Sequence, residues 1–144
     1  MKTQGHTLRK MIAGILVALT VSVAHAQIRG HAINAKVPFD FTVGTRTFAA
    51  GEYSLESPLP GTMWIRNQGG QVVAAVVTHG VQSSEFQKST KLVFHAYNGH
   101  YFLAQIWNEG RNMGRELTPS PVETEVATKH SPGTQVALLV ADRR

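Results

Sequence analysis

Residues 91–107 have the sequence KLVFHAYNGHYFLAQIW, in which two apolar runs flank Asn98-Gly99. Asn-Gly is the strongest short signal for a two-residue hairpin loop, because both central positions of a type I′ turn require positive φ. A two-residue loop also fixes the pairing of the strands, so that Tyr97 faces His100. The sequence therefore predicts an antiparallel hairpin here and predicts which side chains share a face.

Alternation along this hairpin assigns its side chains to two faces. The face predicted to lie in the core carries Leu92, Phe94, Ala96, Tyr101, Leu103 and Trp107. The second face carries Val93, His95, Tyr97, His100, Phe102, Ala104 and Ile106. This second face is too apolar to be fully solvated, so we expect that it is covered. Within the chain, the candidates for cover are Val122 and Val126 of a predicted helix, or residues 136–140; the alternative is a binding face built on His95, Tyr97, His100 and Phe102.

Short strands with closely spaced turns are predicted along the rest of the chain. After a polar lead-in without a clear period (27–34), apolar residues alternate over 35–43, and Pro38 indicates an edge or a bulge in that strand. Further strands are predicted at 51–56, 63–66, 71–78 and 135–140, with 71–78 apolar on both faces and therefore central and covered on both sides.

A helix is predicted at 121–129, because Ser120, Pro121 and Glu123 form a capping box at its start. Glu125 is expected to pair with Lys129 one turn later. The whole pattern predicts an all-β, mainly antiparallel sandwich or barrel with one short C-terminal helix.

Residues 1–26 have the layout of a helical, cleavable signal peptide. Three positive charges precede a fourteen-residue apolar stretch, which ends in Ala24-His25-Ala26. That stretch is shorter than the roughly 20 residues that span a bilayer, so we expect cleavage between Ala26 and Gln27 and no membrane anchor afterwards. Residues 27–144 are then expected to form a single β-rich domain, with its core at about 35–117, in the periplasm or outside the cell.

Charge and composition exclude several functions. The part after residue 26 carries 11 basic and 9 acidic side chains, and they are scattered, whereas nucleic-acid binding requires a basic stripe. The chain has no cysteine, which excludes disulfides, thiolate metal sites and lipid attachment at a cysteine. The partner expected from the sequence is therefore an unknown protein or envelope component, and the oligomeric state is left open.

No catalytic constellation is found in the sequence. There is no Gly-x-Ser-x-Gly elbow, and the glycine pairs lie between strands, where turns explain them. His95 and His100 would lie diagonally on the second face, with Cα atoms roughly 7–8 Å apart, but a metal site requires at least a third ligand. Strand aromatics such as Trp64 and Trp107 are expected in the core rather than in a carbohydrate site. We therefore expect no cofactor and a non-enzymatic binding or structural protein, the alternative being a small hydrolase or metal-dependent enzyme that uses His95 and His100.

Five blocks of the sequence resemble an uncharacterised family of small exported proteins from acidobacteria. They are VPFDFTVG (37–44), AGEYSL (50–55), KLVFHAY (91–97), YFLAQIW (101–107) and GREL (114–117). The resemblance runs from 37 to 117 and implies an exported bacterial β-domain. It implies no activity and supplies no catalytic residue.

Overall fold

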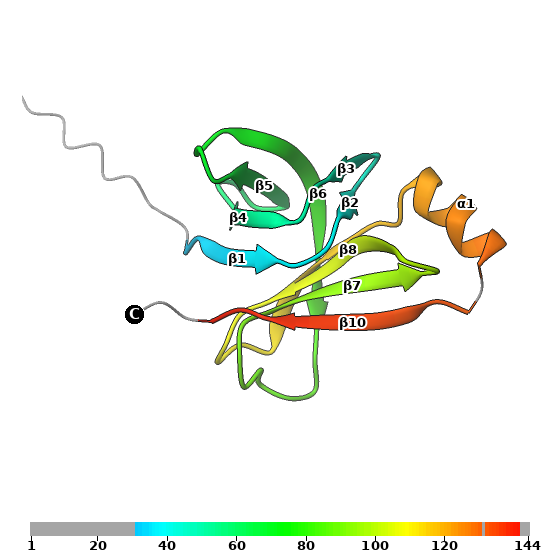
Figure 1. Ribbon diagram of the computed structural model, residues 1–144. Coiled ribbons are helices and arrows are strands. Elements are labelled where there is room, and N and C mark those ends of the chain that lie inside the picture. Colours follow the sequence, from blue (N-terminus) through cyan, green and yellow to red (C-terminus); the bar gives the residue numbers. More distant parts are fainter. Residues whose placement is uncertain (1–30, 131, 142–144) are drawn as a thin grey trace, which may run out of the picture.

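The computed structural model describes residues 31–130 and 132–141 (Figure 1). The predicted signal peptide and the cleavage site predicted between Ala26 and Gln27 lie outside these residues. The fold is the mainly antiparallel β-sandwich with one short helix that the sequence predicts.

Two sheets share one long strand. The first sheet has the order β1 (Ile33–Val37), β4 (Gly51–Glu56), β5 (Thr62–Asn67) and the first half of β6 (Val72–Gln82). The second sheet continues from the other half of β6 through β9 (Met113–Leu117), β8 (His100–Trp107), β7 (Lys91–Tyr97) and β10 (Thr134–Leu139). Strand β6 thus pairs with β5 up to Val77 and with β9 from Thr78 onward. In Figure 1 it runs from one sheet to the other.

The predicted strand over 35–43 is divided into two at Pro38. β1 begins earlier than predicted, at Ile33, and β2 (Phe41–Val43) follows after a three-residue break. β1 pairs with β4 in the first sheet, whereas β2 lies parallel to β8 in the second, so the break carries the chain across the sandwich. The short strand β3 (Arg46–Phe48), which is not among the predicted strands, pairs with β2.

The hairpin of β7 and β8 confirms the predicted turn and register near its tip. Asn98 and Gly99 have φ values of 47° and 83°, and Tyr97 pairs with His100. Further from the turn the register shifts, because Ala104 is an extra residue in β8: Phe94 pairs with Leu103, but Val93 pairs with Gln105. This bulge exchanges the faces of the last three residues of β8, Gln105, Ile106 and Trp107.

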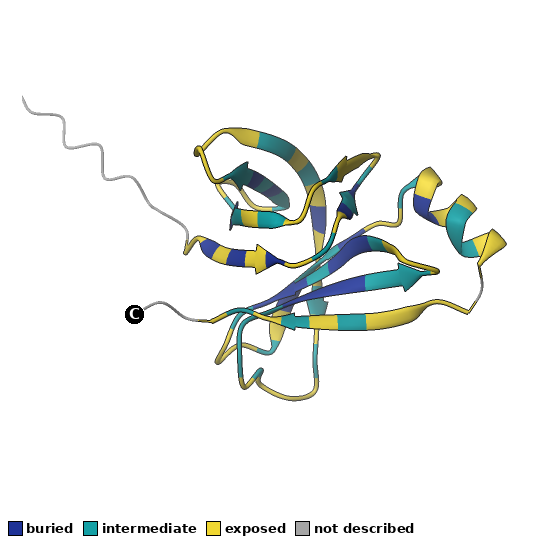
Figure 2. Ribbon diagram, in the orientation of Figure 1, coloured by how far each residue is buried: buried dark blue, intermediate teal, exposed yellow. Residues whose placement is uncertain are grey.

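The predicted faces of Ile106 and Trp107 are therefore wrong. Ile106 is 1% exposed and packs in the core with Leu92, whereas Trp107 lies on the second face. The core is filled from both sheets, and its largest fully buried residues are Phe94, Ile65, Leu92, Ile106 and Val37. Figure 2 shows buried residues alternating with exposed ones along β1 and gathered in β7 and β8.

The sequence predicted that the strand over 71–78 is central and covered on both sides. Strand β6 is central in the sheet order, but the prediction of cover on both sides is wrong. Val77 is 69% exposed and Val72 is 44% exposed. Their outer face meets solvent because the described chain places no second layer there, while Ala74 and Val76 pack against the core.

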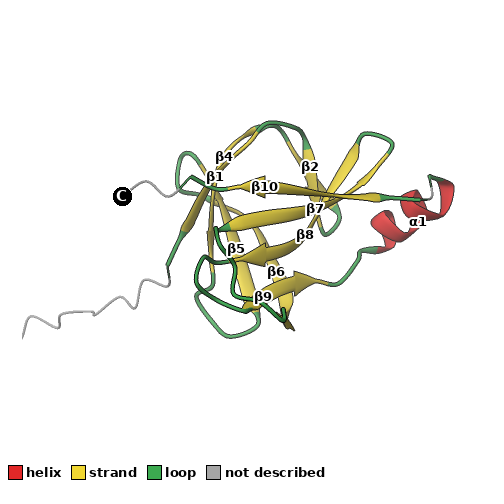
Figure 3. Cartoon of the chain, turned by 90° about the horizontal axis from the view of Figure 1, so that it is seen from below, coloured by secondary structure: helices red, strands yellow, loops and turns green. Residues whose placement is uncertain are grey.

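The helix and the last strand lie where they were predicted. α1 (Pro121–Lys129) begins at Ser120, whose Oγ accepts a hydrogen bond from the backbone N–H of Glu123. Lys129 donates to Glu125 across one helical turn. No helix in the described part of the chain is long and apolar enough to cross a bilayer. α1 lies beyond the tip of the β7–β8 hairpin, and β10 returns from it along β7 (Figure 3).

Candidate functional site

The second face of the hairpin is closed within the chain. Val93, Phe102 and Ala104 are each less than 7% exposed, which confirms that this face is covered. The cover differs from the predicted one, because β10 extends the sheet beside β7 instead of lying over it.

The first turn of α1 reaches the second face through a glutamate rather than through Val122, while Val126 in the second turn is half-buried. Val122 is 41% exposed, whereas Glu123 is buried and its Oε1 lies 2.7 Å from Nδ1 of His95. The hydroxyl of Tyr97 donates to the same oxygen at 3.4 Å. Burial, and secondly the charge of Glu123, raise the pKa of Tyr97. The helix is oriented by this polar cluster because a buried carboxylate requires a partner, which His95 supplies.

The four residues proposed for a binding face, His95, Tyr97, His100 and Phe102, therefore do not form one exposed surface. Phe102 is buried, Tyr97 packs between Phe102 and the backbone of Gly133, and His95 is committed to Glu123. His100 is exposed beside His130, with ring centroids 6.3 Å apart. Among residues 31–130 and 132–141 no group of three histidine, aspartate or glutamate side chains is arranged to hold a metal ion.

A groove lies elsewhere, between β1 and the end of β10, and we call it the β1 groove. Its volume is about 540 Å³. Strand β1 supplies Asn34, Ala35 and Lys36, and residues 139–141 form the opposite wall. The remaining lining residues come from β4, from β5 and from the turn after it: Glu52, Tyr53, Ser54, Arg66, Asn67, Gln68 and Gly70.

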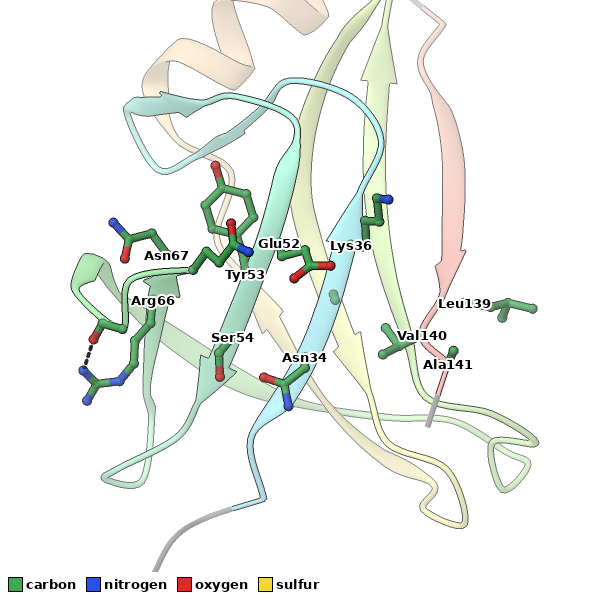
Figure 4. Close-up of a pocket in the computed structure, with 13 residues that line it drawn as sticks. Asn34, Lys36, Glu52, Tyr53, Ser54, Arg66, Asn67, Leu139, Val140 and Ala141 are labelled. Carbon is green, nitrogen blue, oxygen red and sulfur yellow. Dashed lines mark hydrogen bonds between the residues drawn. The ribbon is translucent and has the colours of Figure 1, made fainter. Parts of the chain in front are cut away.

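Alternation along the strands explains the polar side of this groove. Ile33, Ala35 and Val37 point into the core, so Asn34 and Lys36 are turned outward. The pairing of the sheet continues the polar row, because Asn34 faces Ser54 and Ser54 faces Arg66. Figure 4 shows Asn34, Ser54 and Arg66 following one another across β1, β4 and β5, with Leu139, Val140 and Ala141 on the other side of β1.

Arg66 is held firmly at one end of the groove. Its Nε lies 3.2 Å from Oε2 of Glu56, its Nη1 donates to the carbonyl oxygen of Gly70, and its guanidinium lies over the ring of Trp64. Trp64 is consequently on the outer face, half-buried under Arg66. The prediction that Trp64 lies in the core is therefore wrong.

The two strands that border the groove are both edge strands. Within the described residues β1 pairs only with β4, and β10 pairs only with β7. The outer edge of an antiparallel strand presents the N–H and C=O groups of alternate residues, which are available to a further strand. The opening between the sheets therefore combines backbone hydrogen-bonding groups, a polar row and an aliphatic wall.

No family model, curated protein or solved structure matches the chain. The geometry of the β1 groove therefore carries the assignment of function.

A second cavity, of about 510 Å³, adjoins the groove on the other side of β10. It is lined mainly by the loop of residues 83–89, with Lys91, Ala137 and Leu139. Leu139 borders both cavities and is 66% exposed, and Phe86 in the loop is 68% exposed. Neither cavity has His95 or His100 in its wall.

Sequence reasoning missed the β1 groove. The alternation over 33–37 was the signal that could have placed Asn34 and Lys36 on an outer face. No local pattern relates β1 to residues about 100 positions later, so the second wall could not have been found in this way.

Proposed function

We propose that this protein is an exported, non-enzymatic binding module whose ligand occupies the β1 groove. The signal-peptide layout of residues 1–26 supports export, to the periplasm or beyond the cell. The five sequence blocks support membership of the acidobacterial exported family that they resemble.

One observation carries the binding role, namely that the open side of the sandwich is a groove with convergent polar groups. Ligand sites combine an apolar surface with a few placed polar groups in a volume of roughly 300–1,000 Å³. The β1 groove has both, since Leu139 and Val140 line it together with Asn34 and Ser54. The row is carried by strands rather than loops, which keeps its geometry fixed.

The alternative, a hydrolase or metal-dependent enzyme, has one observation in its favour. His95 lies beside a carboxylate, as a general base would. That carboxylate, however, also orients α1 and accepts from Tyr97, which accounts for the pair structurally. His100, the other residue of that hypothesis, lies beside His130 instead.

The binding role is tested by filling the groove. Ser54→Trp places a large ring among the lining residues, and Ser84→Trp places the same ring in the wall of the second cavity as the matched control. The purified exported protein and both variants are immobilised and exposed to envelope extract from the native bacterium. We expect a component that is retained by the wild type and by Ser84→Trp and is lost with Ser54→Trp. Equal retention by all three proteins would refute a ligand site in the β1 groove.

A further inference from the structure

We infer that the ligand of the β1 groove is an extended polypeptide segment, which adds to the outer edge of β1 as an antiparallel strand. This inference rests on the proposed function and names its ligand class. β1 has five residues, so its edge offers about 16 Å of backbone for pairing. A strand that pairs there would run between β1 and β10, where the groove lies.

The backbone chemistry favours a polypeptide. Peptides that bind by strand addition gain affinity from main-chain hydrogen bonds to a sheet edge, and pockets for alternate side chains provide specificity. A sugar would instead require an exposed aromatic ring on which to stack. Tyr53 is the single aromatic residue in the lining, and its hydroxyl donates to the carbonyl oxygen of Ala49. Trp64, on the same outer face, lies under the guanidinium of Arg66.

The side chains that flank the edge define the preferred sequence. Residues of an added strand would alternate between the outer row and the interior side of the opening. On the outer row, Lys36 is the one charged residue of β1; Glu52 of β4 lies across from it on one side, and a carboxylate on an added strand would lie directly across from it on the other, open side, which is also a favoured pair. On the interior side an added residue meets Ala35 and Val140, which suit a β-branched aliphatic side chain. The ligand is therefore a segment in which acidic and aliphatic residues alternate.

Three peptides of about seven residues separate these contributions. The first alternates valine and glutamate, the second alternates valine and lysine, and the third is the first with N-methyl groups on alternate backbone amides. Each is titrated into the isotope-labelled exported protein, and amide chemical shifts are followed by NMR. We expect the valine–glutamate peptide to shift the amides of residues 33–37 and 139–141, and the N-methylated peptide to bind much more weakly.

Charge reversal of Lys36 supplies the matched test of specificity. Lys36→Glu should weaken the valine–glutamate peptide about five- to tenfold and strengthen the valine–lysine peptide, since attraction across the pair becomes repulsion. Lys88→Glu makes the same change in the wall of the second cavity and should alter the affinity less than twofold. Lys88→Glu should melt at the wild-type temperature, whereas Lys36→Glu should melt slightly lower, because the new carboxylate lies across from Glu52.

The outcomes distinguish this inference from the proposed function. Undiminished binding of the N-methylated peptide would overturn strand addition. Strand addition would also be overturned if no peptide shifted the amides of residues 33–37 while an envelope component was still lost with Ser54→Trp. If that component were an oligosaccharide, the binding role would stand and a polypeptide ligand would be excluded. Equal weakening by Lys36→Glu and Lys88→Glu would show that only the net charge matters and would overturn the assigned specificity.

Discussion

Gly114 in β9 lies directly beneath the ring of Trp107, and replacing it with alanine should destabilise the fold. A Cβ atom at this position would lie 2.6 and 2.7 Å from two atoms of the Trp107 ring and 2.9 Å from the carbonyl oxygen of Ile106. The ring has little room to move, because Trp107 is 6% exposed and its Nε1 donates to Oε1 of Gln105.

The size of the effect follows from two opposing contributions. Overpacking of a closed site costs about 1–3 kcal/mol. Glycine-to-alanine replacement also reduces the entropy of the unfolded chain, which stabilises the fold by about 0.4–1 kcal/mol. We therefore expect Gly114→Ala to lower the free energy of unfolding by about 1–2 kcal/mol, or the melting temperature by about 3–8 °C for a domain of this size.

Gly80 in the adjacent strand β6 is the matched control. A Cβ atom there would meet only Cε of Met113, at 3.6 Å, which is an ordinary contact. Gly80→Ala should therefore leave stability unchanged or raise it slightly. Both variants are compared by chemical denaturation, in the wild-type background and with Trp107→Leu. The cost of Gly114→Ala should fall by at least about 1 kcal/mol once the ring is removed.

Two results would refute this reasoning. One is a Gly114→Ala variant as stable as Gly80→Ala, and the other is an equal cost of Gly114→Ala in both backgrounds. Either result would place Trp107 on the core face, where uninterrupted alternation along β8 had put it, and would remove the bulge at Ala104 from the fold.

Three further predictions concern buried polar groups. Thr78 is 3% exposed, and its Oγ1 has no hydrogen-bond partner among residues 31–130 and 132–141, so Thr78→Val should raise the free energy of unfolding by about 1 kcal/mol. A loss of stability on denaturation would show that the hydroxyl is bonded. Burial first, and Glu123 second, raise the pKa of Tyr97 above 10.0. Its stabilising contribution is thus complete below pH 10 and is lost as the pH rises through the higher pKa of the folded state, so melting temperatures measured above pH 10 should fall less steeply in Tyr97→Phe. Glu123→Ala should lower the free energy of unfolding by about 1.5–3 kcal/mol, because it leaves His95 without its charged partner. Glu125→Ala, on the exposed side of α1, is the control and should barely change the melting temperature. Equal melting temperatures of the two variants would contradict the role of the buried pair.

Local chemistry made the tip of the hairpin predictable. Asn98-Gly99 determines a turn type, and the turn determines the pairing of Tyr97 with His100. The bulge at Ala104 was not predicted, because no glycine or proline marks it; the one local sign is the polar Gln105, which uninterrupted alternation would place on the core face. After that residue every face on β8 is the opposite of the one that uninterrupted alternation predicts, which is why Ile106 and Trp107 were exchanged.

The orientation of α1 and the position of the groove depend on tertiary partners. Hydrophobicity alone predicts that Val122 faces the sheet, but His95 makes burial of Glu123 favourable, and the helix turns accordingly. The β1 groove likewise depends on β10 ending beside β1. The alternation of each strand predicts its outward residues but not its neighbours, so the separate polar positions were visible while the site that they form was not.

The pairing of β10 with β7 also has a consequence for how the chain matures. Leu139 pairs with Lys91, so the edge of β7 stays unpaired during synthesis until the chain has grown by nearly fifty more residues. An open edge with buried neighbours such as Phe94 is a template for pairing between chains, and slow closure of distant strands prolongs the exposure. Nascent molecules that meet before Thr134–Leu139 has emerged are therefore the ones at risk of aggregating, and a factor that keeps them apart at that stage would raise the yield of folded protein.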